Sequence, residues 1–530
     1  MKHTNKPFLF FTGLFLLATV SCNKFIDINK DPNNPTTPVL TLLLPATQVS
    51  LAGNMNGVNE GATTVMQQIV STIDRYQQTG ASFNGSWNGF YTQTLPDLQT
   101  VISQGTQQQQ WAYVAVAKLE KAYLYSLLVD LWGDVPYSQA SKGSEITSPA
   151  LESGAAIYDS IFTLIDGALA DIDKGFVLVP ASSDVIYAGN ADKWKRMANS
   201  LKLKLFNQIR LADPARATTG IKALIANTTT LITDNTQDFT FKFGTSISPN
   251  NRHPWYNNEY RSGKSYYQNQ AFINRLFNAD DMRLRYFIYR QNATVGIYNS
   301  ANGNGYYGRP PADPTASPAD QSTRATVGIY PAGGLYDNGT IKDIPASYQF
   351  FTNTGATGTQ RVVANSDGTG AGITPLITNA MVKFIRAEAA LTLSTGDNAK
   401  QLFLDAVTAN LNSISSYAVA NGGPAISTSA TTGFVNKLGL QYDAAADNNA
   451  KLSLIMTQKW IAQFGNGIES YNDYRRTGYP VLDPLLSPLN VFPLRFYYTT
   501  TELATNTTLS GAKGTALQVA QQTKPVFWDK

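Results

Sequence analysis

The sequence is poor in the residues that build disulfides and metal centres. Cys22 is its only cysteine, and of its two histidines only His253 lies beyond the first three residues. A disulfide within the chain is therefore excluded, as are zinc sites that need several Cys or His ligands. A Ser-His-Asp triad would have to use His253, and no GxSxG motif accompanies it. We interpret His253, beside Pro254 and Trp255, as structural.

Charged residues are also few. Only 15% of the chain is Asp, Glu, Lys or Arg, and the net charge is +4, which falls to +2 if Lys2 and Lys6 are removed. The basic residues are scattered among acidic ones and form no stripe that could follow a phosphate backbone. Nucleic acid is therefore not expected as a partner.

The sequence has one long uncharged apolar run, from Phe8 to Val20, which is too short to span a bilayer. Lys2 and Lys6 precede this run and Ser21-Cys22 follows it, which predicts a secretory signal over residues 1–21 and lipidation of Cys22. Thr19 stands where the lipoprotein motif usually has Leu. The alternative is an incidental cysteine beside an ordinary cleavage site.

The segment after Cys22 contains Pro32, Pro35 and Pro38 among asparagines and threonines. Prolines at this density prevent a regular helix. Residues 22–38 are therefore expected to form an extended, lipidated tether that holds the remaining chain, residues 39–530, off the membrane.

Beyond the tether, apolar residues recur three or four positions apart, which indicates amphipathic helices. In 191–211 we expect Asn190 to cap the helix, Trp194 to face inward, and Lys195, Lys202 and Lys204 to face solvent. In 111–131 we expect a single buried stripe. The helices predicted in this way cover residues 111–131, 155–173, 191–211, 376–393, 399–414 and 451–464.

These helices come in neighbouring pairs without the strict period of a repeat array. They predict a mainly α fold with a tetratricopeptide-like scaffold in one domain, residues 39–530. Residues 301–372 and 415–448 are rich in Gly, Thr, Asn, Ala and Pro, so we expect them to be long loop insertions on this scaffold.

Two motif matches fail on inspection. Gly303, Gly305 and Gly308 satisfy GxGxxG spacing, but Arg309-Pro310-Pro311 prevents the helix that a dinucleotide site requires. Asp27, Asn29 and Asp31 resemble a calcium loop, but prolines replace its glycine and its final glutamate, so an EF-hand is excluded. No cofactor is predicted, and a looser calcium site stays open.

Aromatic residues in polar, non-periodic stretches are the strongest indication of a ligand site. Sugars present apolar C–H faces that stack on aromatic rings, while neighbouring amides and charges bond their hydroxyls. The alternative for each ring is packing in the core. A glycosidase pair of Glu259 with a distant Asp also stays open. The aromatic residues in question are Trp87, Tyr91, Trp255, Tyr256, Tyr260, Tyr306 and Tyr307.

Several blocks of the sequence resemble the SusD/RagB family of nutrient-binding outer-membrane lipoproteins, in the order expected for that family. They are the DINKDPNNPT segment after Cys22, LVDLWGDVPYSQA at 128–140, DKWKRMANSLKLKLFNQIR at 192–210, KFIRAEAAL at 383–391, QKWIAQFGNGIESYNDYRRTGYP at 458–480 and KPVFWD at 524–529.

The resemblance implies a non-catalytic, cell-surface binding protein that delivers an oligosaccharide to a SusC-like, TonB-dependent transporter in the outer membrane. A peptide ligand, a secreted glycoside hydrolase and a purely structural lipoprotein are the alternatives. In the family blocks, Trp132, Trp194, Trp460 and the Arg475-Arg476 pair are expected to be scaffold. The predicted ligand-binding residues are Asp74, Arg75, Trp87, Tyr91, Trp255 and Tyr306.

Overall fold

The computed structural model describes residues 39–71, 73–261, 267–291, 306–313, 324–338, 350–351, 357–360 and 363–529. These residues are mainly helical, as predicted. No described helix is long and apolar enough to cross a bilayer. The α-helices are α2 (Leu40–Val65), α3 (Asn84–Gly89), α4 (Leu95–Gln107), α5 (Trp111–Trp132), α6 (Gly154–Asp173), α7 (Ala191–Gln208), α8 (Pro214–Ile225), α9 (Pro254–Tyr256), α10 (Gln270–Asn278), α11 (Leu284–Phe287), α12 (Asn379–Leu393), α13 (Ala399–Ala420), α14 (Thr428–Ala444), α15 (Asn448–Ala462), α16 (Gly467–Thr477), α17 (Thr500–Thr505) and α18 (Ala512–Thr523).

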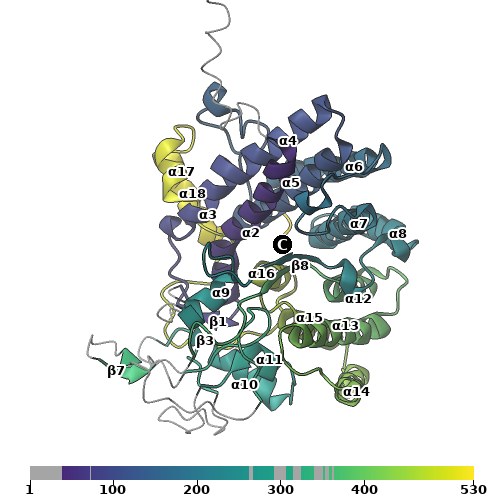
Figure 1. Cartoon of the computed structure of the whole chain (residues 1–530), viewed down its shortest axis with the longest axis vertical. Helices are drawn as coiled ribbons and strands as arrows, with labels where there is room; N and C mark the ends of the chain where they lie inside the picture. Colours follow the sequence, from purple (N-terminus) through teal and green to yellow (C-terminus); the bar gives the residue numbers. More distant parts are fainter. Residues whose placement is uncertain are drawn as a thin grey trace, which may run out of the picture.

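The long helices pack in successive pairs. Helix α5 packs on both α4 and α6, α7 packs on α8, and α12 packs on both α13 and α15. Figure 1 shows these pairs following one another down one side of the molecule, while α9 to α11 and α17 with α18 lie on the other side. Helix α2 contacts α4 and α5 as well as α16, so it links the N-terminal helices to a helix near the C-terminus.

The strands are short and antiparallel, and each pairs with one partner. Strand β2 (Phe239–Lys242) pairs with β8 (Ile373–Ile377), which leads directly into α12. The other pairs are β1 (Ile69–Val70) with β3 (Tyr267–Gln268), β4 (Ile288–Tyr289) with β5 (Thr326–Val327), and β6 (Phe350–Phe351) with β7 (Thr357–Gln360).

Local sequence explains where several helices begin. The Asn190 side chain accepts the Lys193 N–H and caps α7, as predicted. Asp213 caps α8, whose first residue is Pro214, in the position where proline is tolerated. Leu376 was predicted to be helical but lies in β8, and α12 begins only at Asn379, after its cap Thr378.

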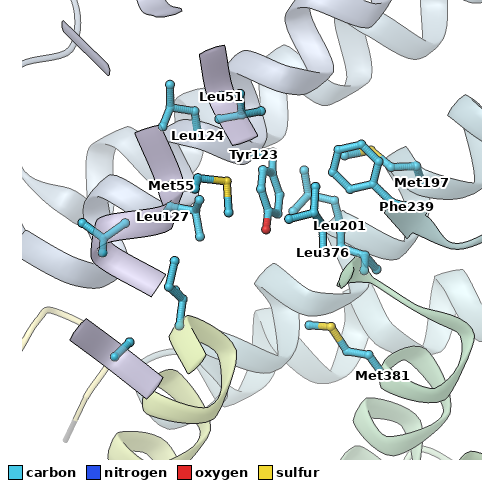
Figure 2. Close-up of a cluster of buried hydrophobic side chains, with 14 of the residues drawn as sticks. Leu51, Met55, Tyr123, Leu124, Leu127, Met197, Leu201, Phe239, Leu376 and Met381 are labelled. Carbon is cyan, nitrogen blue, oxygen red and sulfur yellow. The ribbon is translucent and has the colours of Figure 1, made fainter. Parts of the chain in front are cut away.

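The core is centred on α5. Figure 2 shows Leu51 and Met55 of α2 meeting Tyr123, Leu124 and Leu127 of α5, with side chains of α7, β2, β8 and α12 completing the cluster. Nearly every side chain of α5 from Ala112 to Trp132 is buried. The prediction of a single buried stripe was wrong, because α5 is enclosed by neighbours on all sides.

The second predicted insertion is largely wrong. Residues 415–420 complete α13, and α14 occupies residues 428–444, where Phe434, Leu438 and Tyr442 pack on α13. Glycine and threonine suggested a loop, but these three apolar residues at four-residue spacing bury one helical face. The described parts of 301–372 form connecting segments and strands β5 to β7, and the other residues of this prediction lie outside the described ranges.

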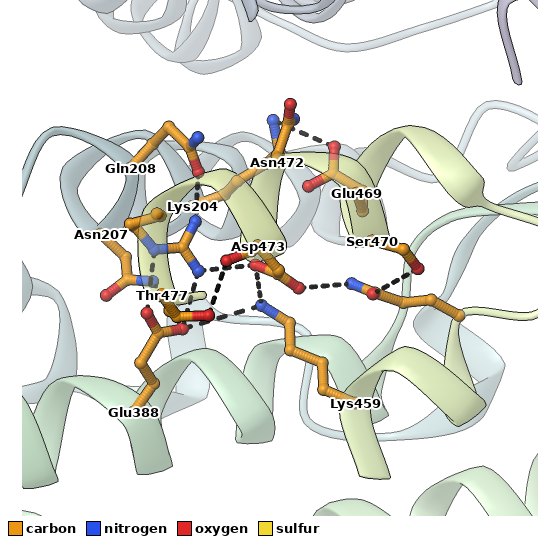
Figure 3. Close-up of polar contacts among 12 residues, drawn as sticks. Lys204, Asn207, Gln208, Glu388, Lys459, Glu469, Ser470, Asn472, Asp473 and Thr477 are labelled. Atoms are coloured by element: carbon orange, nitrogen blue, oxygen red, sulfur yellow. Dashed lines mark hydrogen bonds and ion pairs between the residues drawn. The ribbon is translucent and has the colours of Figure 1, made fainter. Parts of the chain in front are cut away.

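Glu388 is the centre of a buried ionic network that joins α12, α15 and α16 (Figure 3). Arg210 connects this network to the turn after α7. Its carboxylate accepts bonds from Arg476 at 2.8 and 2.9 Å and from Arg210 at 3.1 Å. Burial raises the pKa of Glu388, but the cations of Arg476, Arg210 and Lys459 outweigh this effect and hold the pKa well below its usual range. Glu388 is therefore ionised and fully paired.

Asp130 of α5 holds a second buried cluster together. It accepts hydrogen bonds from the Tyr158 hydroxyl, from Trp528 Nε1 at 2.9 Å and from Asn472 at 3.0 Å, and it lies 3.2 Å from Lys204 Nζ. The C-terminal Trp528 is thereby fixed to the first half of the chain. Lys204 was predicted to face solvent, but it is buried because Asp130 and Glu469 neutralise it.

Glu120 is a buried carboxyl that forms no ion pair within the described part of the chain. Gln48 Nε2 donates to it at 2.8 Å, and Thr47 Oγ1 lies 3.2 Å away. The Thr47 hydroxyl also donates to the Leu44 carbonyl at 2.7 Å, so the Thr47–Glu120 contact is best satisfied by a proton on Glu120. Burial raises the pKa of Glu120 to about 8.

We expect Glu120 to make the protein less stable as pH rises. In the unfolded chain this carboxyl loses its proton near its ordinary pKa of 4.5, whereas the folded protein keeps the proton until about pH 8. The free energy of unfolding should therefore fall by up to roughly 5 kcal/mol between these values. Urea denaturation at pH 5, 7 and 9 should show a weaker pH dependence for Glu120→Gln, with the variant more stable than the wild type at pH 9.

Exposed Glu145→Gln is the matched control and should follow the wild-type pH dependence. Equal pH dependence in Glu120→Gln and the wild type would contradict the prediction.

Candidate ligand-binding site

A pocket of about 630 Å³ opens beside Tyr91, which is the predicted ligand residue that lines it. One wall is the face of α4 that carries Pro96, Gln99, Thr100 and Ser103 at helical spacing. One turn of π-helix, Phe90–Thr94, precedes α4 and places Tyr91 at the edge of this face. This volume is within the range of small-molecule sites.

The opposite wall is the loop from Pro136 to Pro149. Gln139 stabilises the loop by accepting the N–H of Ala150 at 2.9 Å, and Gly143 adopts a φ of +57° at its tip. Lys142 is exposed at the same tip and lines the pocket. We name this cavity, between α4 and residues 136–149, the Tyr91 pocket.

Tyr91 is fixed by its neighbours. Its hydroxyl donates to the Pro136 carbonyl at 3.0 Å, and its ring lies 4.7 Å from the ring of Trp87. Burial raises the pKa of Tyr91 well above its ordinary value, with smaller contributions from nearby Tyr125 and Glu502, so the phenol stays neutral. A fixed, neutral ring beside hydroxyls and amides can stack on a sugar and leave its hydroxyls to polar partners.

Glu502 supplies the carboxylate of this pocket. It accepts the Trp87 indole N–H at 3.1 Å and an Asn506 amide N–H at 2.7 Å. Both of its oxygens therefore already have donors. Of the described residues that line the Tyr91 pocket, no other is acidic.

Trp87 does not present a stacking face in this structure. It is 1% exposed, and its ring packs against Trp132, Tyr91 and Tyr498. Residues 80–94 form consecutive helical turns, so Phe83, Trp87 and Phe90 share an inward face. In this structure Trp87 supports Tyr91 from the buried side, and direct contact between Trp87 and a ligand stays a prediction.

Asp74 and Arg75 lie together, apart from the Tyr91 pocket, and both connect segments of the chain. Buried Asp74 accepts the Ala312 N–H at 3.0 Å. Burial raises its pKa, although Arg309 and Arg75 oppose that effect. Arg75 donates to the carbonyl and the hydroxyl of Ser487 at 2.7 and 2.9 Å. These contacts fasten residues 306–313 and the 478–493 loop to the segment after β1.

Tyr306 and Trp255 are also buried, at 5% and 2% exposure. The Arg290 guanidinium lies 4.8 Å from the centre of the Tyr306 ring, and Trp255 packs on Phe464. Neither ring offers an open face for stacking. The structure therefore does not bring the six predicted residues into one site. Of these six, only Tyr91 lines the Tyr91 pocket.

The pocket residues Gln99, Ser103, Gln139 and Lys142 were not predicted. They belong to polar surface stretches whose composition resembles that of any solvated helix or loop. The available signal was the spacing of Pro96, Gln99, Thr100 and Ser103, which places them on one face of α4, together with the prolines of the facing loop.

The structure shows the surroundings of His253 and Glu259, the two residues considered above for catalysis. His253 is buried, its Nδ1 accepts the Trp255 N–H at 3.1 Å, and burial lowers its pKa to about 3, so it is a neutral structural residue as interpreted. Glu259 is buried and accepts the Thr326 hydroxyl at 2.8 Å. Asp27, Asn29, Asp31 and Cys22 lie outside the described residues, among which no cluster of His, Cys, Asp and Glu is arranged to hold a metal ion.

Comparison with known proteins agrees with this architecture. A family model named SusD-like, described as starch-binding and associating with the outer membrane, matches residues 32–499. A SusD homologue from Bacteroides fragilis is 19% identical, with a TM-score of 0.71 over 93% of this chain and 99% of that one. A chitin-binding SusD homologue from Flavobacterium johnsoniae is 20% identical, with a TM-score of 0.68 over 92% of this chain and 98% of that one. No curated protein sequence matches.

These likenesses confirm the predicted fold, a mainly helical, tetratricopeptide-like scaffold of the SusD type. Trp132, Trp194 and Trp460, which were predicted to be scaffold, are all buried, and their indole N–H groups donate to Tyr497, Asp184 and Met66.

We expect the main effect of Trp87→Ala to be a loss of protein stability. Removing this buried indole should lower the free energy of unfolding by about 3–5 kcal/mol, measured by chemical denaturation. The exposed neighbour Gln93→Ala should change it by less than about 0.5 kcal/mol. A Trp87→Ala protein of wild-type stability that had lost glycan binding would instead support direct contact with the ligand.

Proposed function

This chain belongs to the SusD-like family, and from that premise we propose that it is a cell-surface lipoprotein that binds an oligosaccharide for import. The family's description as starch-binding supports a glycan ligand. The Tyr91 pocket is the feature of this chain that supports it best, because it combines a fixed aromatic ring with a face of hydroxyl and amide side chains.

The proposed role is capture without turnover. Hydrolysis of a glycosidic bond generally uses two carboxyl groups about 5–10 Å apart on either side of it. The described lining of the Tyr91 pocket has Glu502 alone, and Trp87 and Asn506 already occupy its oxygens. This supports a binding protein over a glycoside hydrolase.

Membrane attachment is proposed through a lipid on Cys22. The apolar run Phe8–Val20 and the small Ser21 before Cys22 support cleavage and lipidation there. The family's description places its members at the outer membrane. A SusC-like, TonB-dependent transporter is the proposed recipient of the ligand, an inference that rests on the family alone.

Lipidation makes a direct prediction. Cells fed a radiolabelled or alkyne-tagged palmitate should label the wild-type protein and leave Cys22→Ser unlabelled, and the variant should leave the membrane fraction. Because Cys22 is the only cysteine, no other thiol can accept the lipid. A Cys22→Ser protein that stays in the outer membrane would contradict the anchor.

Blocking the Tyr91 pocket should abolish glycan binding. Ser103 is exposed on the lining face of α4, so Ser103→Trp places an indole in the cavity without disturbing the core. Thr106→Trp, on the same helix and outside the lining, is the control. Affinity-gel electrophoresis of the protein without residues 1–22, over neutral plant, fungal and host polysaccharides, should show retardation of the wild type and Thr106→Trp but not of Ser103→Trp.

A parallel peptide panel tests the alternative ligand. Retardation of Ser103→Trp equal to that of the wild type would place the glycan site elsewhere. Peptide binding in the absence of any glycan binding would overturn the oligosaccharide proposal in favour of peptide import.

A further inference from the structure

A second pocket has a volume of about 540 Å³. It is bounded by the β2–β8 pair, by residues 186–193 before and at the start of α7, and by the C-terminal half of α13. None of its lining residues belongs to the Tyr91 pocket. We name it the β2–α13 pocket.

Its charged lining is mainly cationic. Lys193 and Lys242 both line it, and within the described residues neither forms an ion pair. The Lys193 ammonium lies 5.9 Å from the centre of the Tyr187 ring, and its charge helps to lower the pKa of Asp234. Lys242 is exposed at the end of β2.

Asp238 is the acidic residue among the described lining. Burial raises its pKa to about 7, although the Asn379 N–H and Lys383 oppose this effect and Asp234 adds to it. Asp238 is therefore only partly ionised at neutral pH. Exposed Asp234 lies close by with its pKa lowered, chiefly by hydrogen bonds from Thr236, and Lys383 lies on the same side. The balance of charge at the pocket stays positive.

The remaining lining has the character of a sugar site. The Tyr417 hydroxyl donates to the Ala371 carbonyl at 2.8 Å, so its ring is held in place, and Phe243 forms a second half-buried aromatic wall. Thr236, Ser413 and Ser416 contribute hydroxyl groups. Aromatic faces, hydroxyls and cations in one cavity match the three kinds of surface on an acidic sugar: its C–H face, its hydroxyls and its anionic group.

We propose that the β2–α13 pocket binds an acidic sugar residue, with Lys193 and Lys242 pairing with its carboxylate or sulfate group and Tyr417 or Phe243 stacking on its ring. This inference rests on the proposed glycan function and adds a second site of different chemistry. The protein would then hold neutral sugar units in the Tyr91 pocket and charged units in the β2–α13 pocket.

Titration calorimetry of the protein without residues 1–22 tests the proposal with three probes, each at 20 and 200 mM salt. The probes are hexagalacturonate, its methyl ester and a dextran sulfate oligosaccharide. Binding of hexagalacturonate that weakens with salt, with at least about tenfold weaker binding of the ester, is the expected result for a carboxylate ligand. Preference for dextran sulfate would assign the site to sulfate esters.

Two variants locate the site. The double variant Lys193→Gln/Lys242→Gln removes two positive charges from the pocket. Ser416→Trp, at an exposed position of α13, fills the cavity without changing its charge. Each should weaken binding of the acidic probe by about tenfold or more. The control for the double variant is Lys222→Gln/Lys400→Gln, which removes two positive charges outside the pocket. The control for Ser416→Trp is Asn412→Trp, which lies on α13 outside the pocket. Both controls should bind the acidic probe as the wild type does.

Wild-type affinity in both pocket variants would overturn the proposal, as would failure of all the acidic probes to bind. If neutral glycans still bind to the wild type but not to Ser103→Trp, only the proposal for the β2–α13 pocket fails. If no neutral glycan binds either, the proposed function fails with it.

Discussion

The fold depends on buried charge that is paired across elements far apart in the sequence. Asp130 on α5 bonds to residues of α6, α7 and α16 and to Trp528 near the C-terminus. Glu388 on α12 pairs with Arg210, Lys459 and Arg476. Because an unpaired buried charge costs several kcal/mol, these contacts form together or not at all, and they fix how the helix pairs stack. Glu120, which pairs with no cation among the described residues, keeps its proton up to about pH 8 instead.

Sequence patterns predict the elements that bury apolar faces better than the contacts between buried charges. Apolar periodicity predicts the ends of α5, α6, α7, α12, α13 and α15 to within three residues, except the C-terminal end of α13, which lies six residues further on, because each helix buries an apolar face. The pattern does not predict α2, whose sequence is rich in Gly, Asn and Thr. Its glycines have a packing role: a Cβ at Gly61 would lie 2.7 Å from the Phe83 ring, so Gly61 lets the 80–83 turn approach α2. Lys204 also could not be placed from periodicity. A periodicity rule assigns lysine to the solvent face and takes no account of two buried carboxylates, Asp130 and Glu469, that pair with it.

The structure does not bring the six predicted ligand residues together, for a physical reason. Core packing was the alternative for each aromatic residue in a polar stretch, and Trp87 and Trp255 lie on short helical turns that bury them. The spacing of Phe83, Trp87 and Phe90 carries that information over only two turns, too short for periodicity to stand out. The polar residues that do line the Tyr91 pocket come from α4 and from the 136–149 loop, and only the tertiary structure brings these two together.

Two pockets of different charge on one scaffold would affect how a polymer is held. A single shallow pocket holds a few sugar units by stacking and hydrogen bonds, each of which contributes little after the sugar loses its water. If one polysaccharide chain reaches both pockets, the second contact is intramolecular and its effective concentration can be millimolar. Modest affinity at each pocket would then give firm capture of a long acidic glycan, while a short fragment that fills one pocket would leave readily. Such a difference suits a protein that must bind a polymer and still release its ligand to a partner.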